Sequence, residues 1–239
     1  MNKLKLYLSI IKLMFMGQLE KEFYYLPRLL KKFTNKNSSA IDIGANIGIY
    51  SYLLSFYFRQ VYSYEPINEM YLRCSNLRDN IISRNLALSD EKSEEIINIP
   101  IIDGQPIFGL SSMQNNFKES KQYQINVDKL DNFIDIDNID FIKIDTEGLE
   151  DKVIKGAQKT ILNNRPIIMV EIEQRHNIDS FDYITSIMKK LSYQGFYLNS
   201  SKLASINSFH FGVHQKIDTH GDCITPYYNN FFFIPNEKL

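Results

Sequence analysis

Residues 39–50, SAIDIGANIGIY, decide the fold of this chain. The first residues form a short apolar run that contains Asp42, as expected for a buried strand of a parallel sheet. Gly44 and Gly48 then permit a tight turn and a close approach of the backbone that a side chain would block. From Ile47 onward the apolar positions recur at helical spacing. The stretch therefore predicts a strand, a glycine turn and the start of a helix, which together make a cofactor-binding loop.

The spacing within this loop argues against a dinucleotide as the ligand. Dinucleotide-binding loops place glycine at the first, third and sixth positions, so that the pyrophosphate lies against bare backbone. The corresponding residues here are Gly44, Asn46 and Ile49. An acidic residue ahead of the turn suits a ligand with an amine and a carboxylate near the loop and a ribose further along. S-adenosylmethionine has this layout, and we expect it as the cofactor.

A second predicted strand, residues 61–64, ends at Glu65. This glutamate follows the glycine loop by about twenty residues, where a carboxylate can accept hydrogen bonds from both hydroxyls of a ribose. A lone Gly-x-x-x-Gly is often only a turn. The loop between a strand and a helix, with Glu65 ending the next strand, is a more specific indication of a nucleoside site.

Length, charge and cysteine content limit the class of protein. The 239 residues suffice for one sizeable α/β domain with additions. The formal net charge is -1 and no basic block occurs, so we expect no nucleic-acid partner. Cys74 and Cys223 lie far apart without a pairing pattern, which predicts no disulfide framework and a reducing compartment.

The N-terminus resembles a signal peptide only in part. Residues 1–16 carry early lysines and an apolar stretch, but Lys12 interrupts it and no cleavage site follows. The stretch is also too short to span a bilayer. We expect a helix that covers one side of the domain and a cytoplasmic location. Peripheral membrane contact through this helix stays open as the alternative.

The remaining periodicity predicts alternating helices and strands. Helices are expected over 18–33, 66–79, 149–162 and 181–191. Strands are expected over 82–88, 96–99, 124–127, 139–145, 166–170, 196–198 and 229–234. Pro27 should kink or restart the first helix. The loop 103–113 is either a place for acceptor contacts or an exposed linker.

Carboxylates recur at the ends of predicted strands. Asp145 and Glu147 follow one strand, and Glu171 and Glu173 follow the next. Ligands bind at this edge of open α/β sheets. Lys143 shares its strand face with Asp145, so it is expected to pair with a carboxylate.

Taken in order, several motifs resemble the FkbM family of S-adenosylmethionine-dependent methyltransferases. They are IDIGANIG at 41–48, YEP at 64–66, ALSD at 87–90, SSM at 111–113 and, most specifically, IKIDTEG at 142–148. The resemblance implies the α/β class I methyltransferase fold, Rossmann-like, with a seven-stranded, mostly parallel sheet, its last strand antiparallel, and helices on both faces. An N-terminal helical extension over 1–37 would precede an S-adenosylmethionine-binding methyltransferase domain over 38–239.

The resemblance also implies roles for single residues. The methionine part of the cofactor would contact Asp42, Gly44, Asn46 and Gly48. Glu65 would hold the ribose, and Ala87 with Ser89 the adenine side, although the residues alone fit a polar turn after Leu88 equally well. Asp145, Glu147 and Gly148 would line the floor near the acceptor.

The resemblance further implies transfer of the methyl group to a hydroxyl oxygen, and this reaction sets what the acceptor side needs. The displacement is in-line, so alignment supplies much of the rate, and a base helps an alcohol to lose its proton. The candidates at the sheet edge are Asp145, Glu147, Glu171, Glu173 and His176, of which we favour Asp145, Glu147 and His176. A lone loop histidine is, however, more often a surface residue. Two carboxylates with His176 could hold a divalent metal, which the spacing does not require. The metal therefore stays open.

Family members commonly act on sugars, surface glycans or polyketide-type natural products. We therefore expect O-methylation of a sugar, nucleotide-sugar or surface glycan of the capsule or lipopolysaccharide type, as in polysaccharide biosynthesis. The alternative is a catalytically silent methyltransferase-like subunit that binds a partner. The sequence leaves the acceptor and the oligomeric state open.

Overall fold

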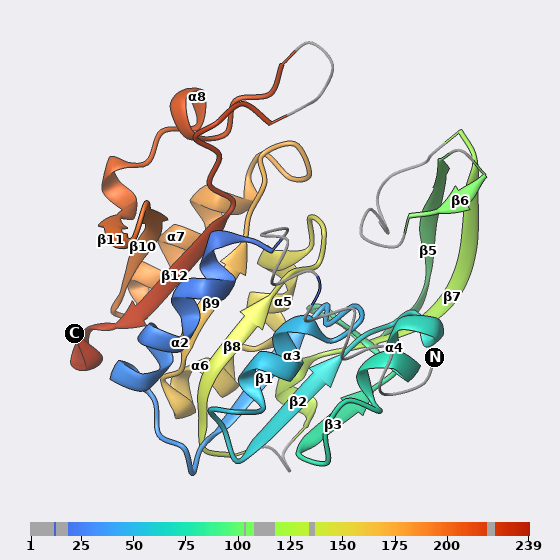
Figure 1. The fold of residues 1–239 in the computed structure, drawn as a ribbon, viewed down its shortest axis with the longest axis horizontal. Coiled ribbons are helices and arrows are strands. Elements are labelled where there is room, and N and C mark those ends of the chain that lie inside the picture. Colours follow the sequence, from blue (N-terminus) through green and yellow to red (C-terminus); the bar gives the residue numbers. More distant parts are fainter. Residues whose placement is uncertain (1–11, 13–18, 103, 108–117, 134–136, 219–222) are drawn as a thin grey trace.

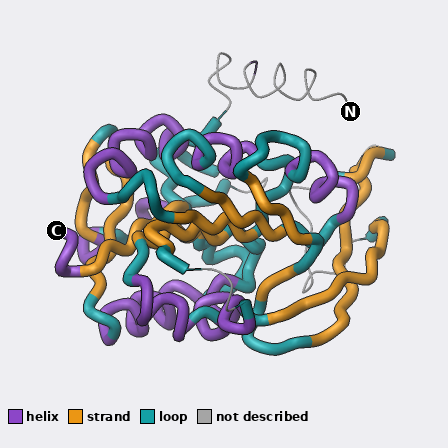
Figure 2. The backbone as a smooth tube through the Cα atoms, turned by 90° about the horizontal axis from the view of Figure 1, so that it is seen from below, coloured by secondary structure: helices purple, strands orange, loops and turns teal. Residues whose placement is uncertain are grey.

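The computed structural model describes residues 12, 19–102, 104–107, 118–133, 137–218 and 223–239. Its centre is a sheet with the strand order β11-β10-β12-β9-β8-β1-β2-β3 (Figure 1). The strands are β1 Ser39–Ile43, β2 Gln60–Tyr64, β3 Ile81–Arg84, β8 Ile139–Ile144, β9 Ile167–Glu171, β10 Tyr193–Asn199, β11 Lys202–Ser205 and β12 Asn230–Pro235. Helices cover both faces of this sheet (Figure 2). The class I methyltransferase fold predicted from the sequence is confirmed.

The direction of the strands also agrees with the prediction, apart from one addition. β1 pairs in parallel with β2 and β8, and β9 continues this parallel half. β12 lies antiparallel between β9 and β10, as expected of the last strand. The count of seven was wrong in the described chain, because β11 adds an eighth strand at the edge. It folds back on β10 through a tight turn in which Ser200 has a φ of 57°. Glycine commonly occupies such a position and would have indicated the turn, whereas the serine here did not.

Two apolar layers hold the helices on the sheet. The helices are α2 Lys21–Phe33, α3 Ile49–Leu54, α4 Asn68–Cys74, α5 Glu150–Gly156, α6 Gln158–Asn164, α7 Ser180–Lys190 and the short α8 Phe211–His214. On one face Ile41 and Ile43 of β1 join a buried cluster with residues of α5, α6 and α7. On the other face Ala40 joins a cluster with Leu26 and Leu30 of α2. Burial on both sides explains why β1 is continuously apolar around Asp42.

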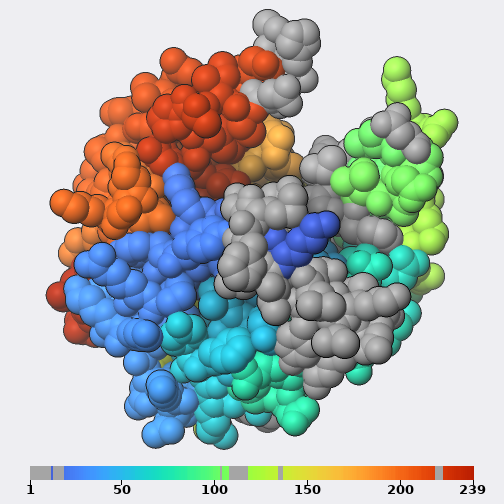
Figure 3. Space-filling view, viewed as in Figure 1, coloured from blue at the N-terminus to red at the C-terminus, as the bar shows by residue number. Residues whose placement is uncertain are grey.

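A second sheet projects from the main body as an arm (Figure 1). It has the order β4-β7-β5-β6, with β4 Ala87–Leu88, β5 Ser93–Ile102, β6 Gln105–Pro106 and β7 Ser120–Asp128. The strands predicted over 96–99 and 124–127 are thus the middles of the longer β5 and β7. Ile97 and Ile99 of β5 pack with Ile67 and Met70, which anchors the arm beside α4. The surface is hollowed between the arm and the C-terminal segments (Figure 3).

Two predicted elements are each divided in the structure. The strand expected over 82–88 becomes β3 in the main sheet and β4 in the arm, because the Asn85 amide donates to the carbonyls of Glu65 and Pro66 at 2.9 and 2.8 Å and turns the chain. The helix expected over 149–162 becomes α5 and α6. The carboxylate of Asp131 accepts hydrogen bonds from the first backbone N–H groups of α6, so α6 begins anew.

Other boundaries differ by a few residues. The helix after the glycine loop begins at Ile49, not Ile47, because Asn46 and Gly48 have φ values of 50° and 85°. The helix expected over 66–79 is confined to α4. Pro27 does not restart its helix, since α2 runs unbroken from Lys21 to Phe33 with the proline inside it.

Some predictions concern parts of the chain that the structure does not describe. The helix over 1–16 and the SSM motif at 111–113 lie outside the described residues. In the described part, no helix is long and apolar enough to cross a membrane. Cys74 is buried and Cys223 is exposed, and both are free.

Candidate active site

Gly44 brings the cofactor loop against the end of β8. A Cβ atom at this position would lie 1.7 Å from the carbonyl oxygen of Asp145, and Gly44 itself has a φ of +76°. Its N–H donates to the Tyr64 carbonyl at 3.0 Å. Only glycine therefore lets the loop after β1 touch the neighbouring strand end.

Gly48 has a different role, in packing. A Cβ atom there would lie 2.4 Å from Leu77 Cδ1 and 2.8 Å from Cys74 Sγ, which places this glycine against the region of α4. Gly48 lines neither of the two cavities beside the loop. The two glycines of the motif thus allow two different contacts, Gly44 with the end of β8 and Gly48 with the region of α4.

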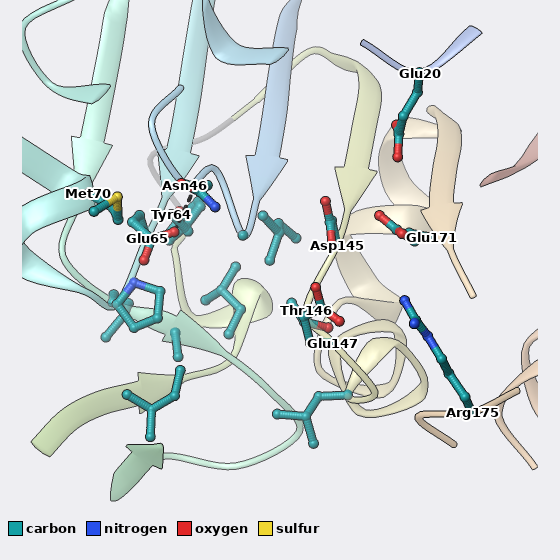
Figure 4. Close-up of a pocket in the computed structure, with 18 residues that line it drawn as sticks. Glu20, Asn46, Tyr64, Glu65, Met70, Asp145, Thr146, Glu147, Glu171 and Arg175 are labelled. Atoms are coloured by element: carbon teal, nitrogen blue, oxygen red, sulfur yellow. Dashed lines mark hydrogen bonds between the residues drawn. The ribbon is translucent and has the colours of Figure 1, made fainter. Parts of the chain in front are cut away.

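A cavity of about 370 Å³ opens at the carboxyl edge of the parallel strands (Figure 4). One end is apolar and lies beneath the arm, where it is lined by Pro66, Met70, Leu86, Ala87, Leu88 and Ile97. The other end is polar and is lined by Glu20, Asp145, Thr146, Glu147, Glu171 and Arg175. Gly44, Asn46 and Glu65 lie on the wall as well. The cavity therefore has distinct apolar and charged ends.

Glu65 is fixed in this wall by the backbone. Its Oε2 accepts a hydrogen bond from Asn46 N–H and its Oε1 one from Ile67 N–H, both at 2.8 Å. Burial raises the pKa of Glu65 to about 7, because these two hydrogen bonds only partly offset desolvation. The carboxylate is thus rigidly placed at the end of β2, and its remaining lone pairs are available to a ligand.

The loop between β8 and α5 is held by Glu150. Its Oε1 accepts hydrogen bonds from Thr146 N–H, Thr146 Oγ1 and Gly148 N–H at 3.1, 3.0 and 3.0 Å. Glu147 has a φ of 53°, a conformation uncommon outside glycine. The contacts of Glu150 stabilise this turn and set the position of the Glu147 side chain at the cavity.

Glu147 and His176 form a pair at the polar end. His176 Nε2 lies 3.3 Å from Glu147 Oε2 and 3.5 Å from Glu173 Oε2. Burial raises the pKa of Glu147 to about 7, and the neighbouring carboxylates of Glu173 and Glu147 raise the pKa of His176. Glu147 lines the cavity, whereas His176 does not. The pair can hold or exchange a proton near neutral pH.

Lys143 and Asp42 lie beneath the loop. Lys143 Nζ is 2.7 Å from Asp145 Oδ2, so the predicted pairing with a carboxylate is confirmed. Burial alone would lower the pKa of Lys143, but the Asp145 and Asp42 carboxylates outweigh it and raise it. Asp42 is fully buried, and its Oδ2 accepts a hydrogen bond from Ser51 Oγ at 2.6 Å.

The structure gathers most, but not all, of the predicted site residues around the loop. The large cavity contains Gly44, Asn46, Glu65, Ala87, Asp145 and Glu147. Asp42 lies in a second cavity next to it. Gly48, Ser89 and His176 line neither cavity. Ser89 is instead tied to the arm, since its N–H donates to the Asp128 carbonyl at 2.9 Å.

The sequence analysis missed Glu20, Arg175 and Glu150. Glu20 comes from the segment before α2, and no local pattern links it to the strand ends. Arg175 adjoins His176 but carried no motif. Glu150 had a signal, since an acidic residue in the first turn of a helix commonly accepts hydrogen bonds from nearby backbone N–H groups.

The sequence left a divalent metal open, and the side chains of the described residues do not decide it. Among the described residues, no group of three or more His, Cys, Asp or Glu side chains is arranged to hold a metal ion. The carboxylates of the polar end are spread around the cavity and do not converge on a point (Figure 4).

This sheet, with β12 antiparallel beside β9 and the glycine loop after β1, defines the class I methyltransferases. One similar solved structure is the methyltransferase FkbM from Methylobacillus flagellatus KT, with a TM-score of 0.53 and 18% identity over 83% of this chain and 44% of that chain. The chain thus spans less than half of that structure's length. Another is the O-methyltransferase from Bacillus cereus in complex with SAH, with a TM-score of 0.50 and 11% identity over 96% and 89% of the two chains.

The family itself is shown by sequence. The family model described as Methyltransferase FkbM domain matches residues 42–196, more than half of the chain. A comparison with curated proteins gives no significant match. The protein belongs to the FkbM methyltransferase family, and the resemblance seen in the motifs is confirmed.

The cavity residues fit the cofactor of this fold, S-adenosylmethionine. A side chain at Gly44 would fill the space beside the loop, and the Glu65 carboxylate faces the cavity at the position of a ribose-binding acid. The apolar end around Met70 and Ile97 suits an adenine ring. Asp42 Oδ1 is buried without a hydrogen-bond partner, so a donor in the second cavity would satisfy it.

Proposed function

We propose that this protein transfers a methyl group from S-adenosylmethionine to a hydroxyl oxygen of a sugar, nucleotide-sugar, surface glycan or related natural product. One observation carries the proposal. A single cavity joins the nucleoside-type wall at Gly44 and Glu65 to Glu147, whose carboxylate contacts His176 outside the cavity. Donor and acceptor would therefore meet in one space, as methyl transfer requires.

The donor would lie along the loop, with each part held by a different element. Glu65 would accept hydrogen bonds from the ribose hydroxyls, and Met70, Ala87 and Ile97 would enclose the adenine. When bound, S-adenosylmethionine supplies an electrophilic methyl group on a sulfonium. The residues of the loop would orient this methyl toward the polar end, because the cavity continues from Gly44 to Asp145 and Glu147.

Glu147 is the group best placed to accept the proton of the acceptor hydroxyl. It lines the cavity, and its pKa of about 7, raised by burial, makes its carboxylate a better base than an ordinary glutamate at neutral pH. His176 would act as a positioning residue, because its Nε2 contacts Glu147 and it does not line the cavity. Asp145 is held by Lys143 and would shape the floor.

The polar end also supports a hydroxyl-rich acceptor. Glu171 and Arg175 add an acceptor and donors of hydrogen bonds opposite Glu147, and Figure 4 shows these side chains directed toward the same space. Arg175 pairs with Glu173, and Glu171 accepts a hydrogen bond from Asn229 Nδ2. Their remaining donors and lone pairs can form hydrogen bonds with the hydroxyls of a sugar, which an apolar acceptor does not offer. The cytoplasm, with S-adenosylmethionine present, is the proposed location.

The test is an incubation with isotopically labelled methyl donor and a panel of sugars, nucleotide-sugars and glycans, read by mass spectrometry. We expect a labelled product of one acceptor class, with the label on oxygen. The Glu147→Gln variant should bind S-adenosylhomocysteine normally and lose at least about a hundredfold in turnover. Binding of that ligand by the unaltered protein without any product from the panel would favour the silent-subunit alternative.

A further inference from the structure

A second cavity, of about 260 Å³, lies next to the first one at the loop. The two share Glu20, Gly44, Asn46 and Asp145. A ligand that follows the loop past Gly44 can therefore extend from the first cavity into the second. The acceptor end with Glu147 and Arg175 belongs to the first cavity alone.

The walls of the second cavity carry charges of both signs. Lys143 supplies a buried ammonium, and Asp42, Asp145 and Glu20 supply carboxylates. Asp42 Oδ1 is buried and has no hydrogen-bond partner. A ligand group that donates hydrogen bonds and carries positive charge would satisfy this oxygen. The cavity thus suits an ammonium group better than an apolar one.

Glu20 stands where the two cavities meet and is held there by aromatic side chains. Tyr50 OH donates to Glu20 Oε2 at 2.7 Å. Tyr50 in turn packs edge-on against Phe23 of α2, with ring centroids 5.5 Å apart. Lys21 Nζ lies 3.5 Å from the centre of the Tyr228 ring, which ties the start of α2 to the C-terminal segment. The Glu20 carboxylate is therefore preorganised beside the loop.

The charge of Glu20 is available to a ligand. Among the described residues no ion pair to its carboxylate is formed, although acidic groups surround it. In Figure 4 Glu20 extends from the segment before α2 toward Asp145 and Glu171. A carboxylate held in this direction without a cationic partner is suited to binding a cation.

The family resemblance already implies that the methionine part of the methyl donor contacts Asp42, Gly44 and Asn46, which line the second cavity. We propose that Glu20 binds the ammonium group of this amino-acid end. This rests on the proposed function, because it assigns the donor a second contact in the same site. Glu20 lies outside residues 42–196, which the family model matches. The segment before α2 would thus complete the donor site, and Asp42 and Asp145 would face the same ammonium group.

The experiment combines a substitution with a truncated ligand. Binding of S-adenosylhomocysteine and of 5′-methylthioadenosine, which lacks the amino-acid end, is measured by calorimetry for the unaltered protein and for Glu20→Gln. We expect Glu20→Gln to weaken S-adenosylhomocysteine about tenfold, as for one charge-assisted hydrogen bond, and 5′-methylthioadenosine less than about twofold. Glu20→Lys should weaken S-adenosylhomocysteine further, because it places like charges together.

Controls separate this contact from a general effect. Glu91→Gln removes the same charge at an exposed position outside both cavities and should leave both affinities unchanged. Equal losses for the two ligands, or no loss for either, would overturn the role of Glu20 while the donor site stands. Failure of the unaltered protein to bind both ligands would overturn the proposed function, and this inference with it.

Discussion

At the scale of single residues, Gly44 has the most demanding environment in the site. Its φ of +76° is a conformation that L side chains rarely adopt, and its missing side chain leaves room for the Asp145 carbonyl. Gly104 has a similar φ of +72°, but nothing lies within 4 Å of a Cβ placed there. A side chain at Gly104 would meet backbone strain alone, whereas a side chain at Gly44 would meet both backbone strain and steric overlap.

This difference predicts unequal effects of the same substitution. Gly104→Ala should lower the free energy of unfolding by about 1–2 kcal/mol, which is the cost of the left-handed conformation alone. Gly44→Ala should lower it by at least about 3 kcal/mol, because the loop and the end of β8 must also separate. Urea unfolding followed by circular dichroism measures both. Equal losses in the two variants would show that the Asp145 contact is unimportant.

At the scale of elements, the turn between β8 and α5 forms the proposed acceptor side of the site. Asp145 ends the strand, Glu147 adopts a positive φ, and Glu150 in the first turn of the helix accepts three hydrogen bonds from the turn. Glu150 is buried, whereas Asp151 beside it pairs with Lys155 on the surface of α5. Substitution of Glu150 therefore tests the buried carboxylate, and substitution of Asp151 in the same helix is the matched control.

Glu150→Ala should remove the common acceptor of the turn. We expect the free energy of unfolding to fall by roughly 2–4 kcal/mol, because buried donors lose their partner. Turnover should fall more than affinity for S-adenosylhomocysteine, since Glu147 moves while Glu65 does not. Asp151→Ala should cost less than about 1 kcal/mol. A stable Glu150→Ala variant with normal turnover would contradict this account of the turn.

At the scale of the whole molecule, the protein buries carboxylates whose desolvation outweighs the contacts that stabilise their charge. Burial raises the pKa of Glu22, Glu65 and Glu147 to about 7 from an ordinary 4.5. Between these values the folded protein retains protons that the unfolded chain has released. The free energy of unfolding must therefore fall as the pH rises through this range.

We expect the ligand-free protein to lose at least roughly 2 kcal/mol of stability between pH 4.5 and pH 7. Asp140 and Glu173 have lowered pKa values, so the stability that their charged forms contribute is lost only at lower pH. The free energy of unfolding should therefore be highest near the acidic end of the range from pH 4.5 to pH 7. Urea unfolding at a series of pH values measures this. Glu22→Gln lies outside both cavities and should reduce the slope. Stability that rises steadily toward neutral pH would refute the prediction.

Local patterns predicted the glycine loop, the strand ends and their acids because these signals depend on neighbours in sequence. The motif at 41–48, Glu65 and the Lys143–Asp145 pairing are of this kind, and the structure places them around one edge of the sheet. The division of the chain at residue 37 stays a prediction, although α2 packs into the same core as the sheet. Gly48 illustrates the limit, since its spacing gave no sign that it packs on α4.

The sequence by itself determined the order of helices and strands, the donor loop and the family, because backbone conformation and apolar periodicity are encoded locally. Only the tertiary structure decided that strand 82–88 divides between two sheets, that Asp131 starts α6, and that Glu20 reaches the cavity. Each of these depends on a hydrogen bond or a contact between residues distant in the chain. Such contacts form only when the two apolar layers bring the elements together.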